Sequence, residues 1–221
     1  VLDVNKAEKN QLLAETKNEE AGYQALLAQQ KAAKAQFEQE LRELEARLQF
    51  VLDPTSIPAE GTAVFRWPLD SVRITQYFGN TEFARSAAYN GQGHNGIDLG
   101  APSGTIVRAA LSGTVIAVNT QVAPMCQYGK WALIRHQNGL TTLYAHLSVV
   151  SVGKGGQVAT GAIVGYSGNT GYAIGPHLHF TVYASEAVQF TQYTCKSGIT
   201  LTIPVAAYTG YINPMLYLPP L

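Results

Sequence analysis

The first 51 residues carry widely spaced apolar side chains in a background of Ala, Gln, Glu and Lys. Residues 4–51 contain one glycine and no proline, a composition that favours helix. In the second half, apolar residues follow alternating steps of four and three, the seam spacing of a coiled coil: Phe37, Leu41, Leu44, Leu48 and Val51. The pattern predicts a long N-terminal helix of coiled-coil type.

This apolar seam is interrupted towards the N-terminus. The same register meets apolar Leu27, Tyr23 and Leu13 but also polar Lys34, Gln30, Glu20 and Thr16. At ~1.5 Å per residue the helix is about 70 Å long, too long to be stable on propensity alone. We therefore expect it to lie against an upstream helix, a second copy or the following domain, either as a structural spacer or as a docking or autoinhibitory arm.

The pattern changes after Asp53-Pro54, which ends the helix. From Trp67 onward, short runs rich in Val, Ile, Thr and Tyr alternate with glycine-containing turns, and Asn138-Gly139 between two runs is typical of a hairpin. No helical periodicity follows residue 66. We predict a helical segment at 1–52, a linker at 53–66 and an all-β domain at 67–221, built as a two-sheet sandwich or open barrel.

Charge follows the same division, since 16 of the 30 charged side chains lie in residues 1–52. The net charge of zero makes nucleic acid an unsuitable partner. No run of 18 apolar residues is present, so no membrane-spanning segment is predicted. No signal peptide is visible, and the start at Val1 within helix-forming sequence is interpreted as a cut or processed end.

Histidines carry the candidate chemistry. His177 and His179 follow a glycine-rich stretch and would share one face of a strand. His94 and Asp98 would also share a strand face, and Gly96 between them leaves a gap for an ion. One imidazole of the His177/His179 pair would complete a site of two histidines and one carboxylate with an open fourth position, as in catalytic zinc sites.

Several stretches, in chain order over most of 67–221, resemble the LytM/lysostaphin-like zinc metallopeptidases of bacterial cell walls. They are ITQYFG, HNGIDLGAPSGTIVRAALSGTV, WALIRHQNGLTTLYAHLS, GKGGQVATGAIVGYSGNTGYAIGPHLHF and the closing NPMLYL. The resemblance implies a LytM-like β domain that binds one Zn²⁺ ion and cleaves peptides of peptidoglycan outside the cytoplasm of a bacterium.

The resemblance also implies roles for individual residues. His94, Asp98 and His179 match the zinc ligands of the family, and His146 and His177 match its two catalytic histidines that do not bind the metal. Tyr89, in the loop before His94, is interpreted either as an oxyanion donor or as an ordinary loop tyrosine. His136 is interpreted as structural.

Two departures from the family pattern stand out. Thr181 replaces the acidic residue that usually follows the H-L-H-F motif, which removes one carboxylate from behind the metal ligands. Residues 122–127 and 186–199 resemble insertions and contain Cys126 and Cys195. The two cysteines are either free thiols or a disulfide; for a protein outside the cytoplasm we predict a disulfide that ties two rim loops together.

Three functions are compatible with these features. The first is a zinc endopeptidase that cuts stem or cross-link peptides of peptidoglycan, regulated through its helix by a membrane complex or a second copy. The second is a non-catalytic activator of a cell-wall amidase at the division site, as in EnvC-like and NlpD-like relatives that also carry a coiled coil. The third, a phosphocarrier, would not need the His94–Asp98 pair. The complete ligand set favours the enzyme.

Overall fold

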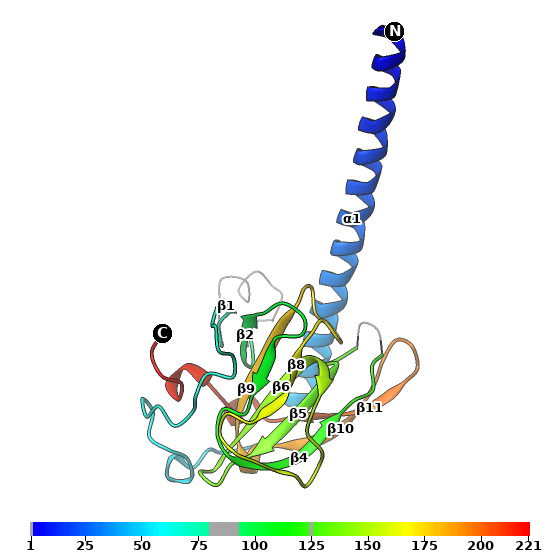
Figure 1. Ribbon diagram of the computed structural model, residues 1–221. Helices are drawn as coiled ribbons and strands as arrows, with labels where there is room; N and C mark the ends of the chain where they lie inside the picture. The colour runs from blue at the N-terminus through cyan, green and yellow to red at the C-terminus, as the bar shows by residue number, and fades with distance from the viewer. Residues whose placement is uncertain (1, 80–92, 124–125) are drawn as a thin grey trace.

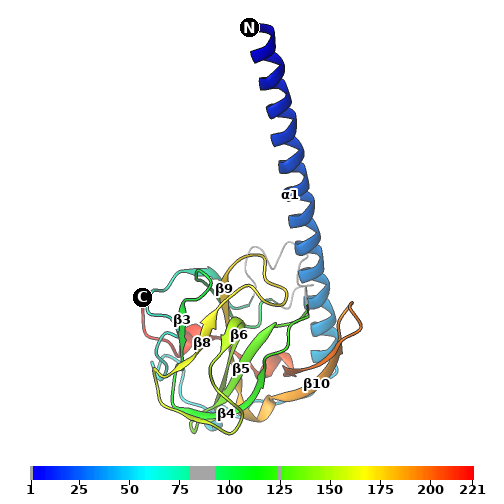
Figure 2. The same cartoon turned by 45° about the vertical axis from the view of Figure 1, so that its right-hand side comes forward.

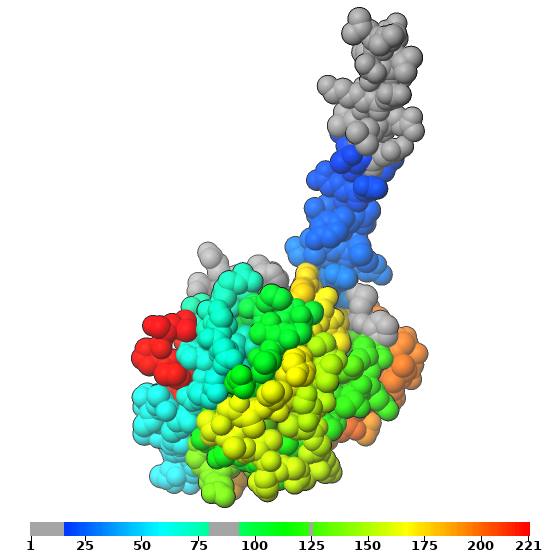
Figure 3. Space-filling model, viewed as in Figure 1, coloured from blue at the N-terminus to red at the C-terminus, as the bar shows by residue number. Residues whose placement is uncertain are grey.

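A long helix, α1 (Leu2–Glu45), stands on a β domain (Figures 1 and 2). The computed structural model describes residues 2–79, 93–123 and 126–221, with side chains described from residue 16 onward. The predictions of an N-terminal helix and a β domain are both confirmed. In the space-filling view, the described part of α1 projects from the body of the domain (Figure 3). None of the described helices is both long and apolar enough to cross a membrane.

Helix α1 ends at Glu45, earlier than the predicted end near residue 51. The Leu48 amide donates to the Glu45 carbonyl over 3.0 Å, an i→i+3 bond that tightens the last turn. Glu45 is buried and accepts a hydrogen bond from the Tyr211 hydroxyl. Just beyond, Thr209 Oγ1 donates to the Phe50 carbonyl over 2.7 Å. Contacts with the β domain, and not helix propensity, therefore set the end of the helix.

The apolar seam of α1 packs on the β domain. Phe37 and Leu41 are buried in its core, and Leu44 packs against that core. Further from the domain, Tyr23 is 63% exposed. Val51, the last predicted seam residue, lies beyond the helix and is 92% exposed. The docked half of the seam thus has its partner within this chain, and a coiled-coil role for the projecting half stays a prediction.

The main sheet is antiparallel and follows the strand order β1-β2-β9-β6-β5-β4-β7, with β12 paired to β9 and β8 paired to both β3 and β6. Its strands are β1 (Ile74–Gln76), β2 (Ile97–Gly100), β3 (Ile106–Arg108), β4 (Gly113–Asn119), β5 (Lys130–Arg135), β6 (Leu140–Val150), β7 (Gln157–Val158), β8 (Ile163–Ser167), β9 (His177–Ala184) and β12 (Tyr211–Ile212). The predicted Asn138-Gly139 hairpin joins β5 to β6, and Gly139 has a φ of 80°.

Strand β9 lies at the centre of this sheet, and all eight of its residues are buried. Its neighbour β6 is buried from Leu140 to Leu147. Both strands carry apolar or aromatic residues on both faces, which favours a central position in a sheet. The two imidazoles at the start of β9 are therefore held on a fully buried strand in the middle of the sheet.

A second sheet consists of the hairpin β10 (Gln189–Thr194) and β11 (Thr200–Val205). The segment 186–199, predicted as a rim loop, is thus largely a hairpin strand with the turn that follows it. Its Thr, Phe and Tyr residues have high strand propensity. Cys195 at the end of β10 forms a disulfide with Cys126, as predicted. Short 3₁₀ turns complete the described fold: η1 (Pro54–Ser56), η3 (Ser185–Ala187), η4 (Tyr208–Gly210) and η5 (Pro214–Leu216).

Candidate active site

The pairing of β2 with β9 brings the predicted site residues together. Asp98 lies opposite His179, and Gly100 lies opposite His177. His94 precedes β2 and is fixed by a backbone bridge to Gly79. Register between two central strands thus sets the relative positions of residues some 80 positions apart in sequence.

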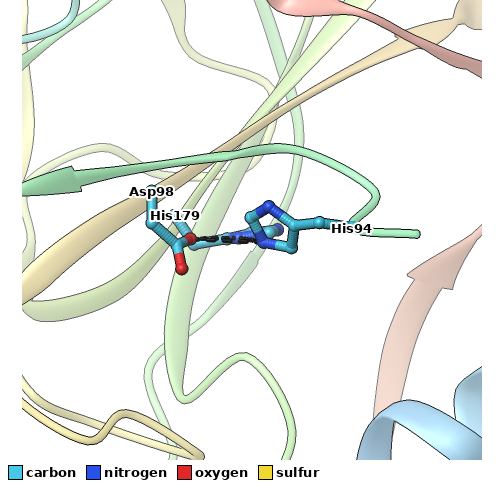
Figure 4. Close-up of side chains that lie close together, drawn as sticks. All are labelled: His94, Asp98 and His179. Atoms are coloured by element: carbon cyan, nitrogen blue, oxygen red, sulfur yellow. Dashed lines mark hydrogen bonds and ion pairs between the residues drawn. The ribbon is translucent and has the colours of Figure 1, made fainter. Parts of the chain in front are cut away.

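His94, Asp98 and His179 turn their side chains toward one point (Figure 4). The distances are 3.1 Å from His94 Nε2 to His179 Nδ1, 2.8 Å from His179 Nδ1 to Asp98 Oδ1 and 3.4 Å from His94 Nε2 to Asp98 Oδ1. Tetrahedral bonds of about 2.0–2.1 Å would place ligand atoms about 3.3 Å apart. The three atoms therefore have the spacing of one face of a metal-centred tetrahedron, and they can hold a metal ion.

The outward-facing nitrogens of both histidines have partners that leave the inward-facing ones for a metal. His94 Nδ1 lies 3.2 Å from the Tyr77 carbonyl, to which it can donate. His179 Nε2 lies 2.8 Å from Thr181 Oγ1, which can accept its hydrogen. Such contacts orient metal-binding imidazoles. The threonine that replaces the usual acidic residue therefore lies in contact with the ring that a carboxylate would have oriented.

The electrostatics favour an ionised carboxylate beside a neutral imidazole, the forms that bind metals. Burial opposes the charge on Asp98, but His94, the Lys34 ammonium and hydrogen bonds with the two histidines outweigh it and hold its pKa well below the usual range. Burial lowers the pKa of His179 to about 4, although Asp98 acts in the opposite direction.

His177 lies beside the candidate ligands without joining them. Its Nδ1 donates to the Gly175 carbonyl over 2.7 Å, and its Nε2 lies 3.8 Å from Asp98 Oδ2. This Nε2 is buried and has no hydrogen-bond partner among the described residues. The equivalence of His177 and His179 at the level of sequence is therefore broken: His179 joins the cluster, and His177 faces it with an unpartnered nitrogen.

His146 comes from β6 and completes a group of four imidazoles. Its ring centre lies 4.7 Å from that of His177 and 5.9 Å from that of His179. Its Nδ1 donates to the Thr170 carbonyl over 2.8 Å, so its Nε2 is left for proton exchange. Burial, then repulsion from His177 and His179, holds its pKa well below the usual value. A neutral imidazole in this position can accept a proton.

The backbone of His146 is unusual, with a φ of 60°. Residues other than glycine rarely adopt this left-handed conformation, and such strain is concentrated at functional sites. The His146 amide donates to the Tyr128 carbonyl over 2.9 Å, which stabilises the bend.

Other predicted residues lie elsewhere. His136 binds the Ser112 carbonyl and Thr142 Oγ1 through its two ring nitrogens, each over 2.9 Å. Tyr89 lies outside the described residues. Gly96 leaves no gap for an ion, because a Cβ there would lie 2.6 Å from the Phe180 carbonyl. The glycine instead allows β9 and the His179 ring to approach.

Helix α1 lies across the site. The sequence pattern predicted the helix but not the surface against which it packs. Lys34, a polar break in the seam, extends its Nζ to 3.8 Å from Asp98 Oδ2. One cavity separates the helix from the histidines; α1 lines it with Lys34, Phe37, Glu38, Leu41, Arg42 and Glu45, and the β domain with Gly93, His94, Asn95, Tyr128, His146, Tyr172 and His179. Its volume of about 40 Å³ holds a few water molecules and no peptide.

Aromatic and polar contacts hold α1 in this position. The Phe37 ring stacks on Tyr172 at 5.1 Å and meets the edges of Tyr128 at 5.8 Å and Tyr193 at 5.4 Å. Tyr193 also donates to Glu40. The three tyrosines were not singled out in the sequence, because they are separated along the chain and only the fold brings them together around Phe37.

Residues 92–190 match the sequence profile of Peptidase family M23. The chain carries a peptidase family M23 domain. The matched segment contains the whole histidine cluster, from His94 to His179.

The M23 domain is similar to two curated relatives. It is 45% identical over 87 residues to the DD-carboxypeptidase/endopeptidase Mpg of Neisseria meningitidis, and 44% identical over 87 residues to the peptidoglycan DD-endopeptidase ShyA of Vibrio cholerae. Each match covers 39% of this chain and 19% of the relative, so the chain spans about a fifth of these proteins.

The fold of the M23 domain is also found in a solved structure. The catalytic domain of the prophage-encoded M23 protein EnpA of Enterococcus faecalis superposes with a TM-score of 0.51 at 23% identity, over 70% of this chain and 98% of that one. This likeness confirms the LytM-like architecture predicted for the β domain.

Proposed function

We propose that the protein is a zinc-dependent endopeptidase that hydrolyses cross-links or stem peptides of bacterial peptidoglycan. The observation that carries the proposal is the triangle of His94, Asp98 and His179 with His146 and His177 beside it. The peptidoglycan DD-endopeptidase activity in the name of one relative supports the substrate class. A disulfide supports a location outside the cytoplasm, because disulfides persist in oxidising compartments.

The proposed ligands are His94 Nε2, Asp98 Oδ1 and His179 Nδ1, whose spacing fits a zinc ion. When bound there, zinc lowers the pKa of water and polarises a carbonyl group. Three protein ligands leave a coordination position open, as a catalytic site requires.

His146 and His177 are the proposed proton-transfer residues. His146 is held neutral, and its Nδ1–H bond to Thr170 leaves Nε2 to accept the proton of the attacking water. His177 is held in the same way by Gly175, so its Nε2 carries a hydrogen only in the imidazolium form; in that form it can donate to the oxyanion or to the leaving amine. The left-handed backbone at His146 and the register of β9 hold the two rings beside each other, with their centres 4.7 Å apart and their planes tilted by 52°.

We further propose that α1 keeps this enzyme latent. The cavity left under the docked helix is too small for a peptide, and Lys34 occupies the mouth of the site beside Asp98. Substrate would therefore have to displace the segment from Lys34 to Glu45. A partner that binds the projecting part of α1, as a membrane complex or a second copy of the chain, would release it.

A non-catalytic activator of a cell-wall amidase is the second candidate. The coverage of the site by α1 favours it, because a groove filled by a helix is also suited to exchanging that helix for a partner segment. The retained ligand triangle and the strained His146 have no role in such an activator.

The deciding experiment measures zinc content and muropeptide release for the wild type, His146→Ala and Arg135→Ala. Arg135 is an exposed residue on β5 and serves as the control. The endopeptidase proposal expects one zinc per chain in all three proteins and product release that only His146→Ala abolishes. Because the docked helix lowers the rate, the comparison is repeated in the Phe37→Ala background. If that background binds zinc and releases nothing beyond the level of His146→Ala, the endopeptidase proposal is wrong.

A further inference from the structure

A second groove opens on the other side of Lys34 and is not filled by the helix. It borders Asp98 and His177 and has a volume of about 390 Å³. The rest of the groove is lined mainly by Arg73, which precedes β1, by Thr75 and Gln76 of β1, and by Ile174 and Pro176 of the loop before β9. Because the groove reaches a proposed metal ligand and a proposed proton donor, any group bound in it lies beside the scissile bond.

Arg73 is held in this groove by a close approach to Gly100. A Cβ at Gly100 would lie 2.4 Å from Arg73 Nη2, 2.9 Å from its Cζ and 3.0 Å from its Nε. The Nε–Cζ–Nη2 side of the guanidinium therefore lies in the space that a side chain at residue 100 would occupy. No left-handed φ requires glycine there, so its missing side chain makes room for Arg73. Gly100 pairs with His177, so the guanidinium lies close to the start of β9.

The described lining of the groove has two basic side chains, Lys34 and Arg73, against one acidic side chain. Arg73 has no carboxylate partner in the part of the chain that the structure describes. Among the described residues that line the groove, Asp98 is the only acidic one; its Oδ1 belongs to the ligand triangle, and its Oδ2 faces Lys34 and His177 at 3.8 Å. A guanidinium presents paired N–H donors whose geometry matches a carboxylate.

We propose that Arg73 binds a free carboxylate on the substrate residue that flanks the scissile amide. This inference rests on the proposed peptidase function and narrows its substrate class. Cross-links made through a diamino-dicarboxylic acid such as diaminopimelate carry such a carboxylate next to the amide nitrogen, whereas glycine bridges carry none. The enzyme would therefore select diaminopimelate cross-links over glycine bridges.

The test measures binding to the full chain, so that it does not depend on turnover. The probes are acetyl-D-alanyl-meso-diaminopimelate, acylated through the amine of the D-centre, and the same compound with the carboxylate of that centre amidated. His146→Ala prevents cleavage, Phe37→Ala in the same protein undocks α1 from the site, and calorimetry gives the dissociation constants. We expect the carboxylate form to bind about tenfold more tightly than the amide, because a bond to a charged group is lost on amidation.

Variants assign this preference to one side chain. In the same background, Arg73→Gln is expected to remove the difference between the probes, and Arg73→Lys to retain part of it. Arg66→Gln, whose guanidinium is paired with Asp70 and does not line the groove, is the control and should retain it fully. Zinc content, measured for each variant, shows that the ligand triangle is intact.

Equal binding of the two probes, or a preference that survives in Arg73→Gln, would overturn the assignment of Arg73. A failure of the peptidase proposal has a different signature. In that case no muropeptide is released by any variant, including Phe37→Ala, whatever the two probes show in the binding assay.

Discussion

Truncating Phe37 to alanine is expected to release α1 from the site. The Phe37 side chain is 4% exposed and contacts three tyrosines of the β domain. Burial of a phenylalanine contributes about 1.5–3 kcal/mol, and each aromatic pair adds about 0.5–1.5 kcal/mol. A loss of about 3 kcal/mol in docking free energy would raise the undocked fraction roughly a hundredfold, since each 1.4 kcal/mol is about a factor of ten.

Two measurements on the full chain follow this change. Limited proteolysis within α1 reports undocking, and the rate of muropeptide release reports access to the site. Both are expected to rise in Phe37→Ala until most molecules are undocked. Tyr23→Ala is the matched control, because this aromatic residue of α1 is 63% exposed and should change neither rate.

The two measurements distinguish the packing of α1 from its effect on activity. If α1 becomes sensitive to protease while muropeptide release stays at the wild-type rate, the helix packs as described but does not restrain the enzyme. If neither rate changes, the docking energy does not come from the aromatic contacts of Phe37.

Three further predictions concern the helix, the metal centre and the disulfide. Burial raises the pKa of Glu45 to about 8, so docking of α1 should be strongest below the ordinary pKa of a glutamate and weaken as pH rises through about 8. Proteolysis of α1 should therefore become faster across this pH range. The same pH response in Glu45→Gln would contradict the role of Glu45. Thr181→Val should lower zinc affinity about 10–100-fold in chelator competition, because His179 Nε2 loses its hydrogen-bond acceptor. Thr181→Ser keeps the hydroxyl and should retain the affinity. Equal zinc affinities of Thr181→Val and the wild type would exclude a role of Thr181 in orienting His179. The Cys126–Cys195 bond spans 69 residues and restricts the unfolded chain. Cys195→Ala removes it and should lower the free energy of unfolding, measured by urea titration, by about 4 kcal/mol. A change below about 1 kcal/mol would show that the bond does not constrain the unfolded chain.

Much of the fold follows from local pattern. The helix composition of the N-terminal segment and the strand runs after Trp67 gave the element types, because helix and strand periodicities differ and neither depends on distant contacts. The end of α1 at Glu45 and the hairpin in 186–199 were placed less well. Both are set by tertiary contacts, since Glu45 is fixed by Tyr211, and β10 has its partner only in β11.

The residue types of the candidate site and their spacing along the chain could also be identified from the sequence. The His94–Asp98 spacing and the alternation of His177 and His179 allowed a metal site, and the family resemblance indicated which imidazole serves as a ligand. The structure supports that division through register, because pairing of β2 with β9 places Asp98 against His179 and leaves His177 opposite Gly100.

What only the tertiary structure decided is the environment of that site. Lys34 and Phe37 belong to a helix that is joined to the β domain through a linker, and Arg73 is exposed on the segment leading into β1. No local pattern reveals that the helix covers the histidines or that the guanidinium lies on Gly100, because both depend on how surfaces distant in sequence fit together. The sequence thus determined which residues can form the candidate site, and packing determined what surrounds them.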